Sequence, residues 1–279
     1  MMTTVAQALR EAAAHLAGSE GRTEAELLIA HGLQKPRAWL FAHDTDALDA
    51  ESCARCMALV ERRRRGEPVA HILGHGGFWS LDLVVTADTL IPRPETELLV
   101  EQALAKLPGQ QALRVLDLGT GSGAIALAIA HDRPNIEMTA VDDDVRALAV
   151  AAKNAARLNL GGIRFLRSDW FSAVAGERFD MIVSNPPYIA EGDPHLAEGD
   201  LRYEPRHALA SGQDGLDALR RIVASAPHHL SLNGALLIEH GWTQAEAVRA
   251  LMAAAGFVAV ETITDLEGRD RVTTGRWPG

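Results

Sequence analysis

The chain has 279 residues, of which 47% are apolar and 24 are glycine, and its formal net charge is −10. This length and composition predict one full globular core with a smaller accessory domain. No stretch approaches the roughly 18 uninterrupted apolar residues of a membrane-spanning helix, and Arg10 and Glu11 interrupt the region where a signal peptide would be apolar. We therefore expect a cytoplasmic protein without membrane contact. The acidic balance disfavours stable binding of a long nucleic-acid duplex.

Residues 1–73 form the first predicted domain, and their apolar spacing predicts helices. The helical segments are VAQALREAAAHL, TEAELLIAHGL, PRAWLFAH and ALDAESCARCMALVERRRR, and no β pattern interrupts them. We expect Thr23 and Glu26 to form a capping box that opens the second helix. Cys53 and Cys56 have CxxC spacing, but no second CxxC or nearby histidine pair accompanies them. We interpret them as packing residues and expect no metal site.

Residues 74–93 are predicted to connect two domains. The glycine cluster GHGG at 74–77 ends the helical region, and FWSLDLVVTADTLIP follows with the composition of two short strands or a hairpin. Pro94 then has the position expected in the first turn of a new helix, with Glu95 and Glu97 beside it. We therefore begin the second predicted domain at residue 94 and continue it to residue 279.

The second domain alternates strand-like and helix-like segments from residue 112 onwards. This alternation predicts an α/β fold in which a parallel sheet has helices on both faces. FVAVETITD and RVTTGRW break the alternation near the end, because only the charged turn LEGRD separates them. A hairpin there would add an antiparallel strand to the parallel sheet.

The first strand of this domain leads into a glycine-rich loop that is a candidate nucleotide site. Glycines permit a tight turn and a close approach of the backbone to a ligand. Asp142 closes the second strand, 23 residues after Gly119, where an acid accepts hydrogen bonds from ribose hydroxyls. Asp169 and Trp170 follow the third strand and would supply an acceptor and an apolar wall. The loop consists of Gly119, Thr120, Gly121, Ser122 and Gly123 after Asp117 and Leu118.

The four residues Asn185, Pro186, Pro187 and Tyr188 follow the apolar run FDMIVS. Open α/β sheets bind their ligands where strands end in loops. A side-chain amide, two residues without backbone N–H donors and an aromatic ring present acceptors beside a flat face. Such a surface suits a planar NH2 group.

Two further segments contain candidate residues. Arg93 and Glu95 fit either the wall of a cofactor cleft or an ordinary helix start with solvated charges. His240, after the fifth strand, is interpreted as a strand-end histidine with satisfied hydrogen bonds.

Together these motifs resemble the class I S-adenosylmethionine-dependent methyltransferases, in which a glycine loop, a ribose-binding acid and an NPPY motif occur in this order. Across nearly its whole length the chain more specifically resembles the release factor glutamine methyltransferases, also called the PrmC or HemK family. The matching segments are GFWSLDLVV, LIPRPETELLV, LDLGTGSGAIALA, SDWF, MIVSNPPYI, DPHL with RYEP, and EHGW.

The resemblance implies a helical substrate-recognition domain at 1–73, a hairpin-like linker at 74–93 and a catalytic domain at 94–279, with a terminal antiparallel strand in a Rossmann-like, mainly parallel seven-stranded sheet. It implies methylation of the glutamine in the Gly-Gly-Gln loop of class I peptide chain release factors, which tunes translation termination. We expect a monomer that uses S-adenosylmethionine and binds no nucleic acid stably.

The family's functional residues carry over to matching positions of this chain. Cofactor binding is implied for Gly119, Thr120, Gly121, Ser122, Gly123, Asp142, Trp170 and Asn185. Substrate binding is implied for Asn185, Pro186, Pro187 and Tyr188, and catalysis for Asn185, Pro186 and Tyr188.

Three other functions remain open from the residues. An amino-methylase of nucleic-acid bases would use the same NPPY surface, because an exocyclic NH2 presents the same two donors as an amide. GTGSGA and Asp142 also fit a dinucleotide-dependent oxidoreductase, although that function leaves NPPY unexplained. The third open function is that of a non-catalytic protein in which the helical domain binds a partner.

Overall fold

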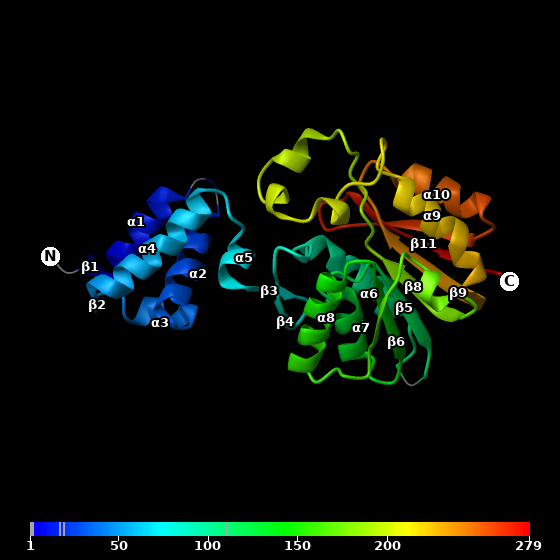
Figure 1. The fold of residues 1–279 in the computed structure, drawn as a ribbon, viewed down its shortest axis with the longest axis horizontal. Helices are drawn as coiled ribbons and strands as arrows, with labels where there is room; N and C mark the ends of the chain where they lie inside the picture. Colours follow the sequence, from blue (N-terminus) through cyan, green and yellow to red (C-terminus); the bar gives the residue numbers. More distant parts are fainter. Residues whose placement is uncertain (1–2, 17, 19, 110) are drawn as a thin grey trace. The chain divides into compact units, whose positions relative to one another are not determined.

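The computed structural model describes residues 3–16, 18, 20–109 and 111–279, so the predicted helical region is described except for residues 1, 2, 17 and 19. The chain divides into two compact units, Met1–His75 and Gly76–Gly279. Figure 1 draws both units.

The first unit is built from short helices around an apolar core. Their bounds are α1 (Val5–His15), α2 (Gly21–Leu33), α3 (Arg37–Ala42), α4 (Ala50–Arg64) and α5 (Val69–Leu73). Leu28, Ile29 and Leu40 are completely buried in this core. The helices therefore bury one shared apolar face, as their sequence spacing predicts.

The predicted capping box at Thr23 is wrong, because Thr23 lies inside α2, whose N-cap is Glu20. Glu26 instead forms ion pairs with Arg22 and Arg37, and its side chain is buried. A capping box does exist at α1, where Thr4 accepts from the Gln7 backbone and the Gln7 side chain accepts from Thr4. The spacing Thr-x-x-Glu also occurs within helices, so spacing alone did not identify the helix start.

The first unit also contains a small antiparallel ladder that the sequence analysis did not predict. β1 (Thr3–Thr4) pairs with β2 (Ala47–Leu48). Two residues on each side are too few to produce an alternating apolar pattern, so the ladder leaves no signal in the sequence.

Cys56 is a packing residue, as the sequence analysis predicted. Its thiol is buried between α2 and α4, with Sγ 3.7 Å from the Ile29 carbonyl oxygen. A Cβ added at Gly32 would lie 2.7 Å from Sγ, so the two helices pack closely at this point. Burial raises the pKa of the Cys56 thiol to about 11. Such a thiol is unreactive near neutral pH.

The second unit opens with a hairpin and a helix start. β3 (His75–Phe78) pairs with β4 (Leu81–Val84), and the 3₁₀ turn η1 (Pro94–Thr96) leads into α6 (Glu97–Lys106). The turn of the hairpin is fixed by Trp79, whose backbone N–H donates to Glu97 Oε1 at 2.6 Å. The hairpin is thereby joined to the first helix of this unit.

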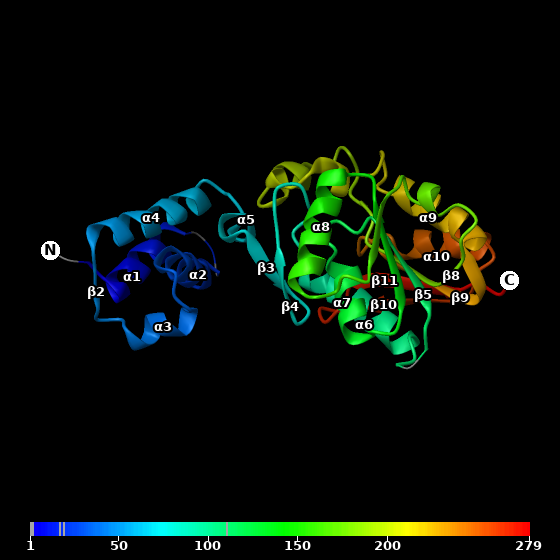
Figure 2. The same cartoon turned by 60° about the horizontal axis from the view of Figure 1, so that its bottom comes forward.

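A seven-stranded sheet forms the centre of the second unit (Figure 1, Figure 2). Its strand order is β10-β11-β9-β8-β5-β6-β7. β11 runs antiparallel to β9 and β10, and the remaining neighbours pair in parallel. The predicted fold, including the terminal antiparallel strand, is therefore confirmed. The strand bounds are β5 (Arg114–Leu118), β6 (Glu137–Asp142), β7 (Arg164–Arg167), β8 (Phe179–Ser184), β9 (Leu230–Glu239), β10 (Val258–Thr264) and β11 (Asp270–Arg276).

Helices cover both faces of this sheet, with α6, α7 and α8 on one side and α9 and α10 on the other (Figure 1). Successive strand residues point to opposite faces, so Val115 packs in the core with α6 and α7, and Leu116 packs with α9 and α10. The helix bounds are α7 (Ala124–Asp132), α8 (Val145–Arg157), α9 (Asp217–Ser225) and α10 (Ala245–Ala254).

The chain reverses its strand order between β5 and β8, which are neighbours in the sheet. Ligands of open α/β sheets bind at such a switch point, beyond the carboxyl ends of the strands. The loops after β5 and β8 are the glycine loop and NPPY, so the topology brings the two principal sequence motifs to one edge.

A long excursion separates β8 from α9. It contains three short 3₁₀ turns, η3 (Pro194–Ala197), η4 (Leu201–Tyr203) and η5 (Arg206–Ala208). The excursion is closed at its base, where the Ile189 backbone N–H donates to Leu209 and the Ser211 N–H donates to Ile189. It is therefore a compact loop with ends that lie together.

Candidate active site

A cavity of about 270 Å³ lies at the carboxyl edge of the sheet. It is bordered by the glycine loop, the ends of β6 and β7, the start of NPPY and the segment 88–96. Of the predicted cofactor residues, those that line it are Gly119, Thr120, Gly121, Ser122, Asp142, Trp170 and Asn185.

The glycine loop has the backbone geometry that requires glycine. Gly119, Gly121 and Gly123 have φ values of 71°, 56° and 86°, in the left-handed region where side chains are strained. A Cβ at Gly121 would meet nothing within 4 Å, so this backbone is open to a ligand. Gly123 does not line the cavity. A Cβ there would lie 2.9 Å from the Leu127 side chain and 3.1 Å from Ala151, so Gly123 permits helix packing.

Hydrogen bonds between buried polar groups fix the glycine loop. The Thr120 hydroxyl donates to Asp117 Oδ2 at 2.7 Å. Burial raises the pKa of the Asp117 carboxyl to about 7, and the bond from Thr120 opposes that rise. Asn154 of α8 donates to the Ser122 carbonyl at 3.0 Å and to Val84 at 3.1 Å. The loop is thus joined to α8 and to β4.

Asp142 occupies the end of β6, where the sequence predicts a ribose-binding acid. Its Oδ2 accepts from the Gly121 backbone at 2.9 Å, and its Oδ1 accepts from the Asp144 backbone at 3.0 Å. Burial raises the pKa of Asp142, and these two hydrogen bonds oppose the rise. Because each carboxylate oxygen has two acceptor positions, both oxygens keep one for a ligand hydroxyl.

Trp170 forms one wall of the cavity, and its Cζ3 lies 3.7 Å from the Cβ position of Gly119. Its φ of 51° is unusual for an aromatic residue. Ser168 supports this turn, because its hydroxyl donates to the Trp170 carbonyl at 2.7 Å and accepts from the Ala173 backbone at 3.0 Å. Asp169 also borders the cavity, but its carboxylate is paired with Arg221 at 2.9 Å.

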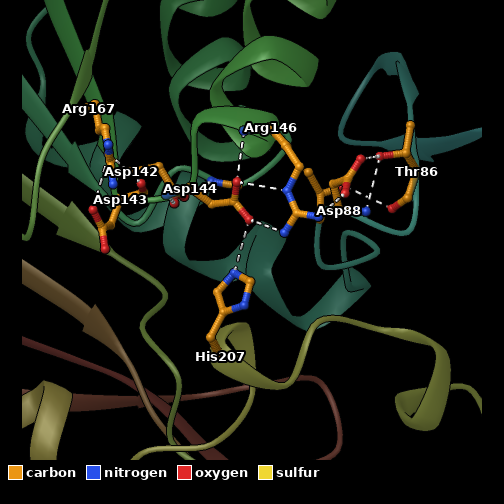
Figure 3. A network of polar contacts seen from close by, with 10 residues as sticks. Thr86, Asp88, Asp142, Asp143, Asp144, Arg146, Arg167 and His207 are labelled. Carbon is orange, nitrogen blue, oxygen red and sulfur yellow. Dashed lines mark hydrogen bonds and ion pairs between the residues drawn. The ribbon is translucent and has the colours of Figure 1, made fainter.

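Charged side chains link the segments at the cavity mouth (Figure 3). Arg146 of α8 lies 3.2 Å from Asp88 and 2.9 Å from Asp144. Asp144 Oδ2 is 3.6 Å from His207 Nε2 in η5. Asp88 and His207 both line the cavity. These contacts connect the loop after β4, the start of α8 and the excursion, although exposed ion pairs contribute little stability.

Arg93 is the member of the PRPE segment that borders the cavity. It forms an ion pair with Glu204, whose side chain is completely buried. Glu204 also accepts from the Ile91 backbone at 2.9 Å. Glu95 is exposed and does not line the cavity. The sequence left both positions open, and the structure brings only Arg93 to the cavity.

The NPPY residues differ in their exposure to the cavity. Asn185 and Pro187 line it, whereas Pro186 is buried. The Asn185 Nδ2 group donates to Thr96 Oγ1 at 3.0 Å. Tyr188 packs against the apolar core, and its hydroxyl donates to Glu239 Oε1 at 3.2 Å.

Sequence reasoning missed Thr96 and Glu239, which both contact the NPPY residues. Glu239 is the last residue of β9, and burial raises its pKa to about 7. Its Oε1 accepts from the Tyr188 hydroxyl, whereas its buried Oε2 has no hydrogen-bond partner among the described residues. Both residues lie in segments that carry the family resemblance, LIPRPETELLV and EHGW, in which Arg93, Glu95 and His240 were the candidate residues.

His240 has the satisfied hydrogen bonds that the sequence analysis expects. Its Nε2 lies 2.8 Å from Thr273 Oγ1, and its Nδ1 lies 2.9 Å from the Gly241 carbonyl. The residue is completely buried, and burial lowers its pKa.

Comparison with known proteins establishes the family of this chain. Residues 7–74 match the PrmC N-terminal domain, and residues 94–200 match the methyltransferase small domain. A release factor glutamine methyltransferase of Xylella fastidiosa is 56% identical, over 92% of this chain and 94% of its own length. The release factor glutamine methyltransferase of Pseudomonas aeruginosa is 52% identical, over 99% of this chain and 99% of its own length. That of Escherichia coli is 50% identical, over 96% of this chain and 97% of its own length. The chain belongs to the release factor glutamine methyltransferase family.

Solved structures support the methyltransferase fold of this family member. A Pyrococcus furiosus methyltransferase matches 72% of this chain and 90% of its own with a TM-score of 0.54, at 20% identity. A Thermus thermophilus 16S rRNA methyltransferase, solved with AdoMet and guanosine, matches 72% of this chain and 49% of its own with a TM-score of 0.51, at 21% identity.

Membership of the release factor glutamine methyltransferase family makes the chain an enzyme and a methyltransferase. The oxidoreductase and the non-catalytic binding protein are therefore set aside. Within the described part of the chain, no helix combines the length and apolar character needed to cross a membrane.

Proposed function

We propose that this chain methylates the side-chain nitrogen of the glutamine in the Gly-Gly-Gln loop of class I peptide chain release factors, and so tunes translation termination. The names of its relatives, at 50–56% identity over nearly their whole length, support the substrate. The observation that carries the chemistry is the Asn185 amide, which borders the same cavity as the glycine loop and Asp142.

S-adenosylmethionine suits this cavity. The open backbone at Gly121 accommodates a ligand, the free acceptor positions of Asp142 match ribose hydroxyls, and Trp170 provides an apolar wall for an adenine. When bound, this cofactor supplies a methyl group on a sulfonium, which is electrophilic without a metal. Ser122 and Asn185 border the same cavity on the glycine-loop and NPPY sides.

The NPPY residues are proposed to hold the substrate amide. An amide nitrogen is a poor nucleophile, because its lone pair is delocalised into the carbonyl. The Asn185 Oδ1 atom and the Pro186 carbonyl would each accept one N–H of the glutamine amide, which fixes the nitrogen with its lone-pair face toward the methyl group. Such orientation can remove on the order of 7–11 kcal/mol of an activation barrier.

The other NPPY residues are proposed to stiffen the loop and to maintain its shape. Pro187 limits the backbone freedom of the loop, and the Tyr188 carbonyl accepts from the Gln244 amide at 2.9 Å. Stacking of the Tyr188 ring on the substrate amide stays a prediction. After methyl transfer the substrate nitrogen loses a proton to water, and no side chain is assigned as a base.

The helical region 1–73 is proposed to recognise the release factor. Residues 7–74 match the PrmC N-terminal domain, which supports a role specific to this family. The catalytic fold, by contrast, is shared with methyltransferases that act on other substrates, so it does not by itself select a protein substrate.

A labelled-methyl assay tests the proposed substrate. Purified class I release factor, its variant with alanine in place of the Gly-Gly-Gln glutamine, and ribosomal RNA would each be incubated with the enzyme and labelled S-adenosylmethionine. We expect label only in the unaltered release factor. Label in RNA but not in protein would instead support the base amino-methylase.

A further inference from the structure

Arg93 is the only arginine or lysine among the described residues that line the cavity at the carboxyl edge of the sheet. Its side chain is 29% exposed, so a ligand in the cavity can reach it. His207 also lines the cavity, but its Nε2 faces Asp144 Oδ2 at 3.6 Å. A ligand carboxylate is repelled by acidic groups and attracted by a nearby cation. The acidic residues that line the cavity are Asp88, Asp142, Asp143 and Asp169.

The guanidinium of Arg93 is held in place by Glu204. The Glu204 side chain is completely buried, and its Oε1 accepts from Arg93 Nη2. Its Oε2 accepts from the Ile91 backbone at 2.9 Å, so only one oxygen of Glu204 is engaged by Arg93. A guanidinium has five N–H donors. Within the described part of the chain, the Nε and Nη1 groups of Arg93 donate to no other residue. Arg93 thus has a fixed orientation and keeps donors for a ligand.

Arg93 lies on the side of the cavity that contains Asn185. It is the N-cap of η1, the turn that ends at Thr96, and Thr96 Oγ1 lies 3.0 Å from Asn185 Nδ2. Asp142 ends β6 and Trp170 follows β7, and in the sheet β5 with its glycine loop separates these two strands from β8. Arg93 is therefore on the other side of the glycine loop from the residues assigned to the ribose and the adenine.

The chemistry of S-adenosylmethionine gives this position a role. The proposed function assigns its adenine to Trp170 and its ribose to Asp142, and it brings the methyl group on the sulfonium to the Asn185 side. The same sulfonium carries the methionine part, which ends in a carboxylate. This carboxylate is the one anionic group of the cofactor, and it needs hydrogen-bond donors when it leaves water.

We infer that Arg93 binds the carboxylate of the methionine part of S-adenosylmethionine. The inference rests on the proposed function, in which this cofactor occupies the cavity. The contact is a charge-assisted hydrogen bond from a guanidinium whose orientation Glu204 fixes. Asp142 and Trp170 are assigned only to the nucleoside part, so Arg93 makes the cavity select a nucleoside that carries an amino acid.

S-adenosylmethionine and its decarboxylated form are a matched pair of ligands that tests this inference, because they differ only in the carboxylate. Calorimetric titration would measure both affinities for the unaltered enzyme and for Arg93→Met, whose side chain is unbranched and uncharged. We expect Arg93→Met to weaken S-adenosylmethionine binding by about 10-fold to 100-fold, which corresponds to about 1.4–2.8 kcal/mol. Its affinity for the decarboxylated form should fall by no more than about threefold. Arg269→Met, at the exposed turn between β10 and β11, is the control and should leave both affinities unchanged.

Equal weakening of the two ligands in Arg93→Met would overturn the inference, because Arg93 would then shape the cavity without contacting the carboxylate. Unchanged affinity for S-adenosylmethionine would overturn it as well. Failure of the unaltered enzyme to bind S-adenosylmethionine would reject the proposed function itself, independently of the variants.

A second variant covers the case in which Arg93→Met does not fold. Arg93→Met leaves Glu204 buried without its cationic partner, which is destabilising. The double variant Arg93→Met, Glu204→Gln removes both charges and so avoids the unpaired carboxylate. A loss of affinity confined to S-adenosylmethionine supports the inference, and an equal loss for both ligands contradicts it.

Discussion

At the scale of single residues, the Asn185 side chain is the group on which the proposed methyl transfer depends. It borders the cavity, and its amide is held by Thr96 rather than by solvent alone. The sequence identified Asn185 because NPPY follows a buried strand. It did not identify Thr96 or Glu239, since their contacts with Asn185 and Tyr188 join segments that only the folded sheet brings together.

Asn185→Ala removes the proposed acceptor while leaving the glycine loop and Asp142 in place. We expect turnover to fall by about 100-fold to 1,000-fold, as is typical when a preorganised hydrogen-bonding group is lost. S-adenosylmethionine binding should stay measurable by calorimetry. The exposed Asn135 provides a control, because Asn135→Ala should leave turnover unchanged. Near-normal turnover of Asn185→Ala would refute the proposed amide contact.

At the scale of elements, the strands and helices of the second unit could be predicted from their alternation, because each buries a regular apolar face. The excursion between β8 and α9 could not, since its 3₁₀ turns are short and its buried Glu204 is fixed by Arg93 and the Ile91 backbone, which are far away in the sequence. The same limit explains the incorrect capping box at Thr23. A short polar pattern such as Thr-x-x-Glu caps a helix only where the fold begins a helix at that threonine. The spacing of the residues alone does not show where the helix begins.

Asn154 shows how one buried residue connects such elements. Its Oδ1 accepts from the Val84 backbone at 2.7 Å, while its Nδ2 donates to Val84 and Ser122. Asn154→Ala leaves these buried groups without partners, so the free energy of unfolding should fall by about 2–4 kcal/mol. Urea denaturation measures this change, and S-adenosylmethionine affinity should weaken with it. Asn135→Ala should change stability by less than about 0.5 kcal/mol. Equal stabilities of the two variants would contradict the connecting role of Asn154.

At the scale of the whole molecule, two buried carboxyl groups near the carboxyl ends of β5 and β9 make stability depend on pH. Burial raises the pKa of Asp117 from 3.8 and of Glu239 from 4.5, in both cases to about 7. The folded state therefore holds more protons than the unfolded state between these values. The stability that each group contributes is complete below its unfolded pKa and is lost as the pH rises through its folded pKa.

Glu239→Gln tests this linkage. Each pKa unit corresponds to about 1.4 kcal/mol, so ionisation of Glu239 should remove about 3 kcal/mol between roughly pH 4.5 and pH 7. Urea denaturation across this range should show a smaller loss of stability in Glu239→Gln than in the unaltered protein. The exposed Glu246 provides the matched control, since Glu246→Gln should follow the unaltered protein. Parallel pH profiles for all three proteins would show that Glu239 does not titrate in this way.

In the proposed function, Asn185 presents one glutamine side chain for methylation. Mass spectrometry of peptides from a class I release factor, after incubation with S-adenosylmethionine and the enzyme, tests this role most directly. We predict a single added methyl group on the glutamine of the Gly-Gly-Gln loop, and no such group when Asn185→Ala is used. Methylation at another residue, or equal methylation by Asn185→Ala, would contradict the account.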